Sequence, residues 1–296
     1  MSDIKSGLII KAISGFYYVK HENEIIECHA KGIFRKDGIS PIVGDFVEFI
    51  TENDSATISK LLPRKNYLVR PPLANVDMLI IVAAITQPEP NPLIIDKMAA
   101  IADYKGIEPV IVFSKVDLLK NEELYEIYRK AGFKVFVVSV MDGSDISELM
   151  DILPTKVSVF AGSSGVGKSS LLNKIDSRLG LQTAEVSKKH FRGKHTTRHV
   201  ELYELENGGY VADTPGFSSL ETPQLEQMLK EDLHFAFREF APFINNCKFS
   251  GCSHINTKGC SVIEAVNDGI IQKQRYNSYL AMYDEVKNIK EWEFKK

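Results

Sequence analysis

A glycine-rich segment has the residue types and the spacing of a phosphate-binding loop. Residues 162–169 read GSSGVGKS, match G-x-x-x-x-G-K-S, and lie between an apolar run and a segment with helical spacing. Glycines let backbone N–H groups face phosphate oxygens, Lys168 can reach the β and γ oxygens, and Ser169 can bind Mg²⁺. The alternative is a glycine-rich turn in an α/β core. We expect nucleotide binding by Gly162, Ser163, Ser164, Gly165, Val166, Gly167, Lys168, Ser169 and Ser170, with Lys168 also catalytic.

A second short element, Asp213-Thr214-Pro215-Gly216, ends the apolar run GYVAD. It has the form of the D-x-x-G element of GTPases, in which the carboxylate holds Mg²⁺ through water and the glycine amide contacts the γ-phosphate. The same four residues could also form a simple β-turn. Because a phosphate-binding loop precedes them, we expect Asp213 to act at the magnesium ion and Gly216 in catalysis.

The segment Ser114-Lys115-Val116-Asp117 has the form of the N-K-x-D element that reads guanine, except that Ser114 replaces Asn. A buried aspartate that pairs with guanine discriminates against adenine, which has no matching pair of donors. Serine lacks the longer amide that would tie the loop to the base, so we expect modest affinity with guanine preference retained. Ser139 follows the next apolar run, where the last and weakest of the GTPase motifs would fall. We expect all five residues to bind nucleotide.

A concentrated positive segment follows the expected phosphate-loop helix. Residues 188–199 read KKHFRGKHTTRH and contain five Lys or Arg, three of the seven histidines and no acidic residue. One interpretation is a solvated loop. The other is a switch loop that contacts RNA phosphates, an interaction that weakens with salt. The RNA-contact candidates are Lys188, Lys189, Arg192, Lys194 and Arg198.

The same segment could also complete a magnesium site and a hydrolytic site. Thr196 or Thr197 could supply a hydroxyl ligand to Mg²⁺, and we slightly prefer Thr196. Phe217 stands where many GTPases have a glutamine that orients water, so intrinsic hydrolysis should be slow. His195 is the best internal replacement because a neutral imidazole can orient or deprotonate water. Its alternative role is simple contact with RNA.

Three of the four cysteines gather with one histidine in the pattern C-x4-C-x-H-x5-C. Three sulfurs and one nitrogen make a complete tetrahedral set for Zn²⁺, and four protein ligands leave no open position, which indicates a structural metal. The expected ligands are Cys247, Cys252, His254 and Cys260. Cys28 stands apart and is expected in a core.

The remaining pattern predicts three units that position these residues. Residues 1–66 contain five short β segments separated by turn signals, which favour a five-stranded OB-like barrel over an SH3-like one. Residues 67–221 alternate apolar runs with amphipathic helices, as in a parallel sheet covered on both faces. Residues 222–296 are predicted to be helical and zinc-binding, with a long helix near 270–292. That helix is either a packing helix with a solvated basic face or an RNA contact through Lys273, Arg275, Lys287 and Lys290.

The base-reading elements precede the phosphate loop, whereas ordinary GTPases have the opposite order, so the domain is expected to be circularly permuted. With its VGD barrel motif, permuted elements, RGKHTT segment and Cys/His cluster, nearly the whole chain resembles the RsgA (YjeQ) family of GTPases, which act in small ribosomal subunit biogenesis. The resemblance implies an OB barrel, a central GTPase domain, a zinc domain, and GTP hydrolysis stimulated by the small subunit. In the permuted order, the strand that ends in DTPG leads directly to the zinc domain and could transmit nucleotide state.

Composition sets broad limits on function. A formal net charge of -3 argues against bulk attraction to nucleic acid, 44% hydrophobic residues are ordinary for a globular protein, and no apolar run is long enough to span a bilayer. The first residues lack a secretory pattern, so we expect a cytoplasmic protein. We also expect a monomer. We predict a Mg²⁺-dependent GTPase that binds the small ribosomal subunit and its rRNA as a late assembly checkpoint. The alternatives are a P-loop ATPase or phosphotransferase, and a nucleotide-gated RNA-binding protein with negligible hydrolysis.

Overall fold

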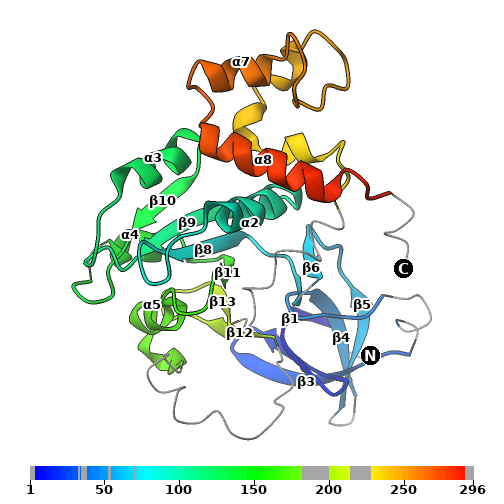
Figure 1. The fold of residues 1–296 in the computed structure, drawn as a ribbon. Helices are drawn as coiled ribbons and strands as arrows, with labels where there is room; N and C mark the ends of the chain where they lie inside the picture. Colours follow the sequence, from blue (N-terminus) through cyan, green and yellow to red (C-terminus); the bar gives the residue numbers. More distant parts are fainter. Residues whose placement is uncertain are drawn as a thin grey trace, which may run out of the picture.

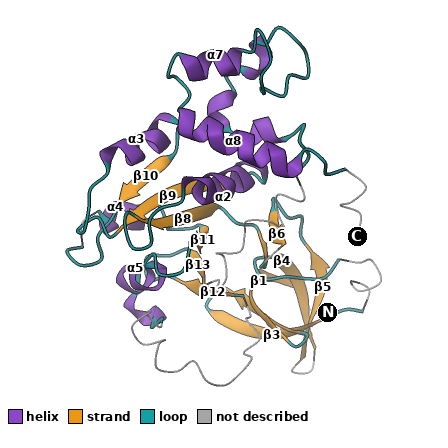
Figure 2. Ribbon diagram, viewed as in Figure 1, coloured by secondary structure: helices purple, strands orange, loops and turns teal. Residues whose placement is uncertain are grey.

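The structure, a computed structural model, describes residues 4–32, 34, 39–52, 55–69, 71–143, 145–181, 200–213 and 228–290. A β-barrel, an α/β layer and a helical C-terminal region follow one another along the chain and in space (Figure 1). Figure 2 shows that the strands occupy the first two parts and that helices gather around and beyond the second. Within the described residues, no helix is both long and apolar enough to cross a membrane.

Five strands form the N-terminal barrel: β1 (Ile4–Ile13), β2 (Phe16–His21), β3 (Glu24–Ala30), β4 (Phe46–Glu52) and β5 (Ser55–Leu61). Their order is β1-β2-β3-β5-β4, and an additional β1–β4 pairing closes the barrel. Only the β3–β5 pairing in this barrel is parallel. This closed five-stranded arrangement confirms the expected OB-type barrel. Its interior is apolar and includes the fully buried side chains of Ile9, Val19, Cys28, Val47, Phe49 and Ile58.

The VGD motif closes the joint between the barrel and the α/β layer. The Asp45 carboxylate is fully buried and receives two hydrogen bonds from the Arg64 guanidinium, of 2.6 and 2.8 Å. Gly44 has a φ of 87°, and a Cβ there would lie 2.1 Å from the Ala74 carbonyl oxygen, so glycine is required. The joint includes a short hairpin that the sequence did not predict, β6 (Tyr67–Val69) with β7 (Pro72–Ala74).

The α/β layer contains strands β8 (Met78–Ala84), β9 (Glu108–Ser114), β10 (Lys134–Val137), β11 (Val157–Ala161), β12 (Glu201–Glu204) and β13 (Tyr210–Asp213). Their order is β10-β9-β8-β11-β13-β12, and all neighbours are parallel except β12 and β13. Every residue of β8 and β11 is buried, which explains their continuous apolar runs. One pairing, Lys11 with Glu201, joins β1 to β12 and makes the barrel continuous with this sheet.

Helices cover both faces of the sheet. They are α2 (Pro92–Tyr104), α3 (Glu122–Lys130), α4 (Ile146–Asp151) and α5 (Lys168–Ile175). Buried side chains of α2 and α3 share one hydrophobic cluster with alternate residues of β8 and β9. Those of α4 and α5 share a second cluster with the other residues of the same strands. The layer is therefore a three-layer α/β structure, as the alternating sequence pattern predicted.

The C-terminal region packs on the outer side of α2. Over residues 228–290 it contains the 3-10 turns η4 (Leu233–Ala236), η5 (Arg238–Phe240) and η6 (Ile244–Asn246), followed by α7 (Ser261–Asn267) and α8 (Lys273–Val286). In Figure 1, α8 crosses α2, and α7 lies farther from the sheet. The helix expected over 270–292 is shorter, because Gly269 turns the chain with a φ of 74° and α8 begins after Gln272.

The environment of Arg275 contradicts both interpretations of this residue, as part of a solvated basic face and as an RNA contact. Its side chain is fully buried, and it donates hydrogen bonds to the carboxylates of Asp96 on α2 and Glu239 on η5, both at 2.7 Å. The guanidinium also lies between the rings of Phe133 and Phe237, with centroid distances of 5.0 and 4.8 Å. Arg275 is therefore neither solvated nor available to RNA. Lys273 is exposed, as is Lys287, which pairs with a carboxylate of its own helix.

Candidate nucleotide site and metal centre

The expected nucleotide-binding residues meet at one edge of the sheet. Strands β8, β9, β10, β11 and β13 are parallel, so their carboxyl ends lie at the same edge. The base-reading segment follows β9, Ser139 follows β10, and the phosphate loop follows β11. After β8 the chain continues to β9, which pairs with one edge of β8, whereas β11 pairs with the other edge. Ligands of open α/β sheets bind at such a reversal of strand order.

The phosphate loop has the backbone geometry that its glycines allow. Gly162 has a φ of 143°, and a Cβ there would lie 2.1 Å from the Val82 carbonyl oxygen on the adjacent strand. Gly167 has a φ of 95° and caps the N-terminus of α5. The Lys168 ammonium donates to the Gly162 and Ser163 carbonyls at 2.6 and 2.9 Å, so it lies inside the curve of the loop. A positive side chain and a helix N-terminus therefore face the same space, an arrangement that attracts phosphate.

The side chains expected to read the base lie on the neighbouring loops, where two of them are hydrogen-bonded to each other. The Ser139 hydroxyl is fully buried and donates to Oδ1 of the exposed Asp117 carboxylate at 2.8 Å. The Ser139 hydroxyl oxygen in turn accepts the backbone N–H groups of Met141 and Asp142, at 3.2 and 3.4 Å. Ser139 thus orients Asp117 and fixes the loop that begins after it. Lys115 adopts a left-handed φ of 59°, and its ammonium donates to the Gln87 carbonyl.

Ser114 makes a contact that the sequence did not predict. Its hydroxyl is almost fully buried and donates to the Val166 carbonyl in the phosphate loop at 2.6 Å. The Ser114 side chain therefore connects the two loops. Val116, the remaining residue of the segment, is buried and packs in the hydrophobic core under it.

The two expected magnesium ligands that the structure describes lie at the ends of adjacent strands, one just beyond β11 and one on β13. Ser169 is the second residue of α5, directly after the phosphate loop, and Asp213 is the last residue of β13, which pairs with β11. Several other predicted residues lie outside the described residues and stay predictions. They are Lys188, Lys189, Arg192, Lys194, His195, Thr196, Thr197, Arg198, Gly216 and Phe217.

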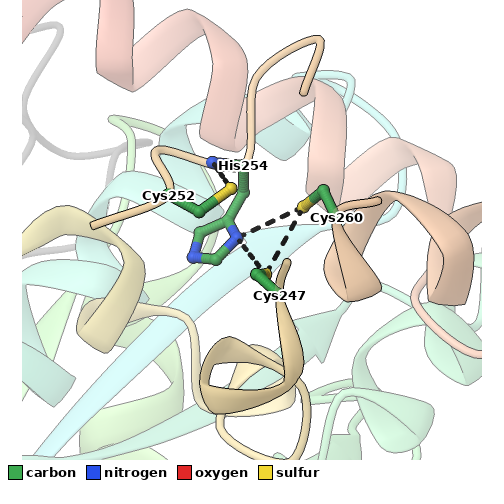
Figure 3. Close-up of side chains that lie close together, drawn as sticks. All are labelled: Cys247, Cys252, His254 and Cys260. Carbon is green, nitrogen blue, oxygen red and sulfur yellow. Dashed lines mark hydrogen bonds between the residues drawn. The ribbon is translucent and has the colours of Figure 1, made fainter. Parts of the chain in front are cut away.

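The four expected metal ligands converge in the C-terminal region (Figure 3). One donor atom from each of Cys247, Cys252, His254 and Cys260 lies within 4.8 Å of the other three. The Cys247 and Cys260 sulfurs are 3.8 Å apart, and His254 Nδ1 lies 3.5 and 3.4 Å from them. Tetrahedral zinc with ordinary bond lengths requires sulfur–sulfur and sulfur–nitrogen separations of about 3.8 and about 3.6 Å. The donor set therefore fits a zinc ion, and the cluster could hold one.

The surroundings of the cluster favour the metal-binding forms of His254 and Cys247 but not that of Cys260. Burial lowers the pKa of His254 to about 4, so its imidazole is neutral and has a free lone pair at neutral pH. Burial alone would raise the pKa of Cys247, but hydrogen bonds from Ser261, Cys260 and Val262 together lower that pKa. Burial raises the pKa of Cys260 to about 12, a cost that a bound cation would offset.

Two tyrosines of α8 hydrogen-bond to the segment that carries the metal ligands, residues 247–260, called the metal loop below. The Tyr276 hydroxyl donates to the His254 carbonyl at 2.8 Å, and the Tyr279 hydroxyl donates to the Ser253 carbonyl at 2.7 Å. Neither residue was singled out from the sequence. Their spacing of three residues on a helix indicates a shared face but does not reveal what that face contacts.

The barrel, the nucleotide-binding edge and the order of the elements along the chain define a circularly permuted GTPase. The family models described as RsgA N-terminal domain and RsgA GTPase match residues 6–58 and 61–223. The small ribosomal subunit biogenesis GTPase RsgA of Caldanaerobacter subterraneus subsp. tengcongensis is 50% identical over 293 residues, covering 98% of each chain. The chain belongs to the RsgA family.

Two solved structures have the same overall fold. The crystal structure of YloQ, a circularly permuted GTPase, is 36% identical, has a TM-score of 0.81, and covers 97% of this chain and 96% of its own. The crystal structure of YjeQ from Thermotoga maritima is 35% identical, has a TM-score of 0.82, and covers 97% of this chain and 100% of its own. The predicted permutation and the order of barrel, sheet and C-terminal region are therefore confirmed.

Proposed function

We propose that this protein binds the small ribosomal subunit and hydrolyses GTP as a late checkpoint in assembly of that subunit. The observation that carries the proposal is the Asp117–Ser139 pair beside the phosphate loop, in a chain whose relatives are named for small ribosomal subunit biogenesis. An oriented carboxylate at the base-binding end favours guanine over adenine. The ATPase alternative has no comparable feature in its support.

The chemistry divides among residues on the two sides of the site. Lys168 and the amides of the phosphate loop bind the β and γ phosphates, and Ser169 and Asp213 hold Mg²⁺ together with Thr196. Gly216 contacts the γ-phosphate, and Asp117 reads the base. When bound, Mg²⁺ offsets negative charge that develops on the phosphate oxygens.

Hydrolysis depends on a water-orienting residue that lies outside the described residues. Phe217 cannot orient water, so intrinsic turnover is slow, and His195 supplies the missing function when the subunit is bound. The basic residues between Lys188 and Arg198 contact rRNA phosphates. His195→Ala should abolish stimulated hydrolysis and leave GTP binding intact, whereas near-normal stimulated turnover would eliminate His195 as the catalytic group.

We further propose three functional units: an RNA-binding barrel over residues 1–66, the GTPase domain over 67–221 and a zinc domain over 222–296. One structural zinc ion, held by the Cys/His cluster, stabilises the last unit. The protein acts as a monomer in the cytoplasm.

The proposal is tested by steady-state phosphate release from GTP and from ATP, with and without purified small ribosomal subunits, at low and high salt. Strong stimulation of GTP hydrolysis by small subunits, absent with ATP and weakened by salt, is expected. Large subunits serve as the control partner, and Lys168→Ala controls for contaminating hydrolases. Slow GTP hydrolysis that is indifferent to the subunit would leave a GTPase whose partner is different.

A further inference from the structure

Ser114 occupies the first position of the base-reading segment, but its contacts point toward the phosphate loop. Its hydroxyl lies 2.6 Å from the Val166 carbonyl oxygen and 3.4 Å from that of Ala83. The side chain is 1% exposed. A serine hydroxyl has a single proton to donate, and both acceptors nearest to it are backbone carbonyls of the protein. Ser114 therefore has no donor left for a bound base.

The partners of Ser114 connect the two halves of the nucleotide site. Val166 lies two residues before Lys168, on the segment expected to enclose the phosphates. Asp117 lies three residues after Ser114, on the segment expected to read the base. The Ser114–Val166 bond spans 52 residues of sequence and directly joins these segments.

The backbone around Ser114 is itself well fixed. The Ser114 carbonyl accepts the Ile85 N–H at 3.0 Å, which extends the pairing with β9 one residue beyond the end of β8. Val166 is buried and packs with Val82 and Leu171 in the cluster beneath α5. A hydrogen bond between two buried and anchored segments fixes their separation more firmly than one between mobile loops.

We propose that Ser114 is a positioning residue that sets the distance between the base-reading loop and the phosphate loop, and that it does not contact the base. This inference rests on the proposed function, because it assumes that guanine nucleotide spans these loops. A nucleotide that binds both loops benefits from their fixed spacing, since less ordering is required on binding. Loss of the bond should therefore accelerate nucleotide release.

The chain contains a matched control for removal of a buried serine hydroxyl. Ser158 on β11 is fully buried, and its hydroxyl has no hydrogen-bond partner among the described residues. Ser158→Ala removes the same atoms from the same sheet without breaking a bond. Ser114→Thr retains the hydroxyl and serves as the conservative variant.

The experiment measures the dissociation rate of a fluorescent GDP analogue from the full-length protein and its variants. A buried hydrogen bond contributes enough to predict that Ser114→Ala raises this rate about fivefold to tenfold. Ser158→Ala and Ser114→Thr should each remain within about twofold of the wild type. If Ser114→Ala does not fold, Ser114→Cys, which has a weak S–H donor, should show a smaller increase of about twofold to fivefold.

A second measurement separates positioning from base contact. The N7 atom of guanine is an acceptor that 7-deaza-GDP lacks. If Ser114 acts only through Val166, Ser114→Ala should weaken GDP and 7-deaza-GDP by the same factor. A loss of affinity for GDP alone would show direct contact and overturn the proposal.

The outcomes also distinguish this inference from the proposed function. Ser114→Ala kinetics equal to those of Ser158→Ala, in a wild type that prefers GDP to ADP, would refute the positioning role and leave the GTPase intact. A wild type without preference for GDP over ADP would refute the proposed guanine reading itself.

Discussion

Replacing Arg275 by methionine should detach the C-terminal region from α2. The substitution preserves much of the side-chain volume but leaves the buried Asp96 and the nearly buried Glu239 without their partner. Removal of one member of a buried ion pair costs about 3–5 kcal/mol, because the remaining charge is uncompensated. The two cation–π contacts, with Phe133 and Phe237, are lost as well. We therefore expect Arg275→Met to destabilise the contact between the C-terminal region and α2 by the full cost of breaking a buried ion pair.

Hydrogen exchange measures this effect where it occurs. A loss of about 3–5 kcal/mol corresponds to protection factors that fall about 100-fold to 4,000-fold in α8 and in the outer face of α2. Protection in the barrel should not change. Arg275→Lys keeps the charge but cannot bridge two carboxylates with a rigid fork, so an intermediate loss is expected.

A surface arginine provides the matched control. Arg129 on α3 pairs with Glu122 and Glu126, and its side chain is 39% exposed. Because exposed pairs contribute about 0–1 kcal/mol, Arg129→Met should reduce protection at most about fivefold. If Arg275→Met had no greater effect than Arg129→Met, the buried network would not be what holds the C-terminal region to α2.

Further predictions concern the nucleotide site and the metal cluster. Ser139→Ala should weaken GDP binding about fivefold to tenfold in a titration, because Asp117 loses the bond that orients it, and an unchanged affinity would contradict that role. Gly162→Ala should abolish nucleotide binding in the same assay while the protein remains folded by circular dichroism, since a Cβ would collide with the Val82 carbonyl. At pH 8 a thiol reagent should modify three cysteines after zinc chelation and a fourth only in denaturant. Burial raises the pKa of Cys28 to about 11, so this thiol stays protonated and shielded in the folded protein.

Local patterns predicted most of the fold and the chemistry of the metal cluster. The apolar runs of β8 and β9 and the turn residues between barrel strands reflect local burial, which a sequence records directly. The four metal ligands lie within fourteen residues, so their spacing in the sequence was enough to predict that they form one site. The β6–β7 hairpin was missed because strands of three residues carry too little periodicity to detect.

Contacts between distant segments could not be predicted in this way. The sequence placed Ser139 near the base only through the order of motifs, and its bond to Asp117 depends on β9 and β10 being neighbours. Arg275 resembles a solvated helix residue, because nothing near it in sequence shows that Asp96, 179 residues away, will face it. The contact between Ser114 and Val166 was not predicted for the same reason, since Val166 comes from a different strand–helix unit.

The arrangement of α2 gives the C-terminal region a second connection to the nucleotide-binding edge. The first is the covalent one that permutation creates beyond β13. The second runs through α2, whose inner face packs on β8 and whose outer face carries the buried Asp96–Arg275 pair. The segment between β8 and α2 also accepts the Lys115 ammonium through the Gln87 carbonyl. A shift of the loop expected to read the base would therefore displace the start of α2, and the ion pair would transmit this displacement to α8. Arg275→Met should then make hydrogen exchange in the metal loop independent of nucleotide state. Cutting the chain beyond β13 should by itself leave that dependence in place.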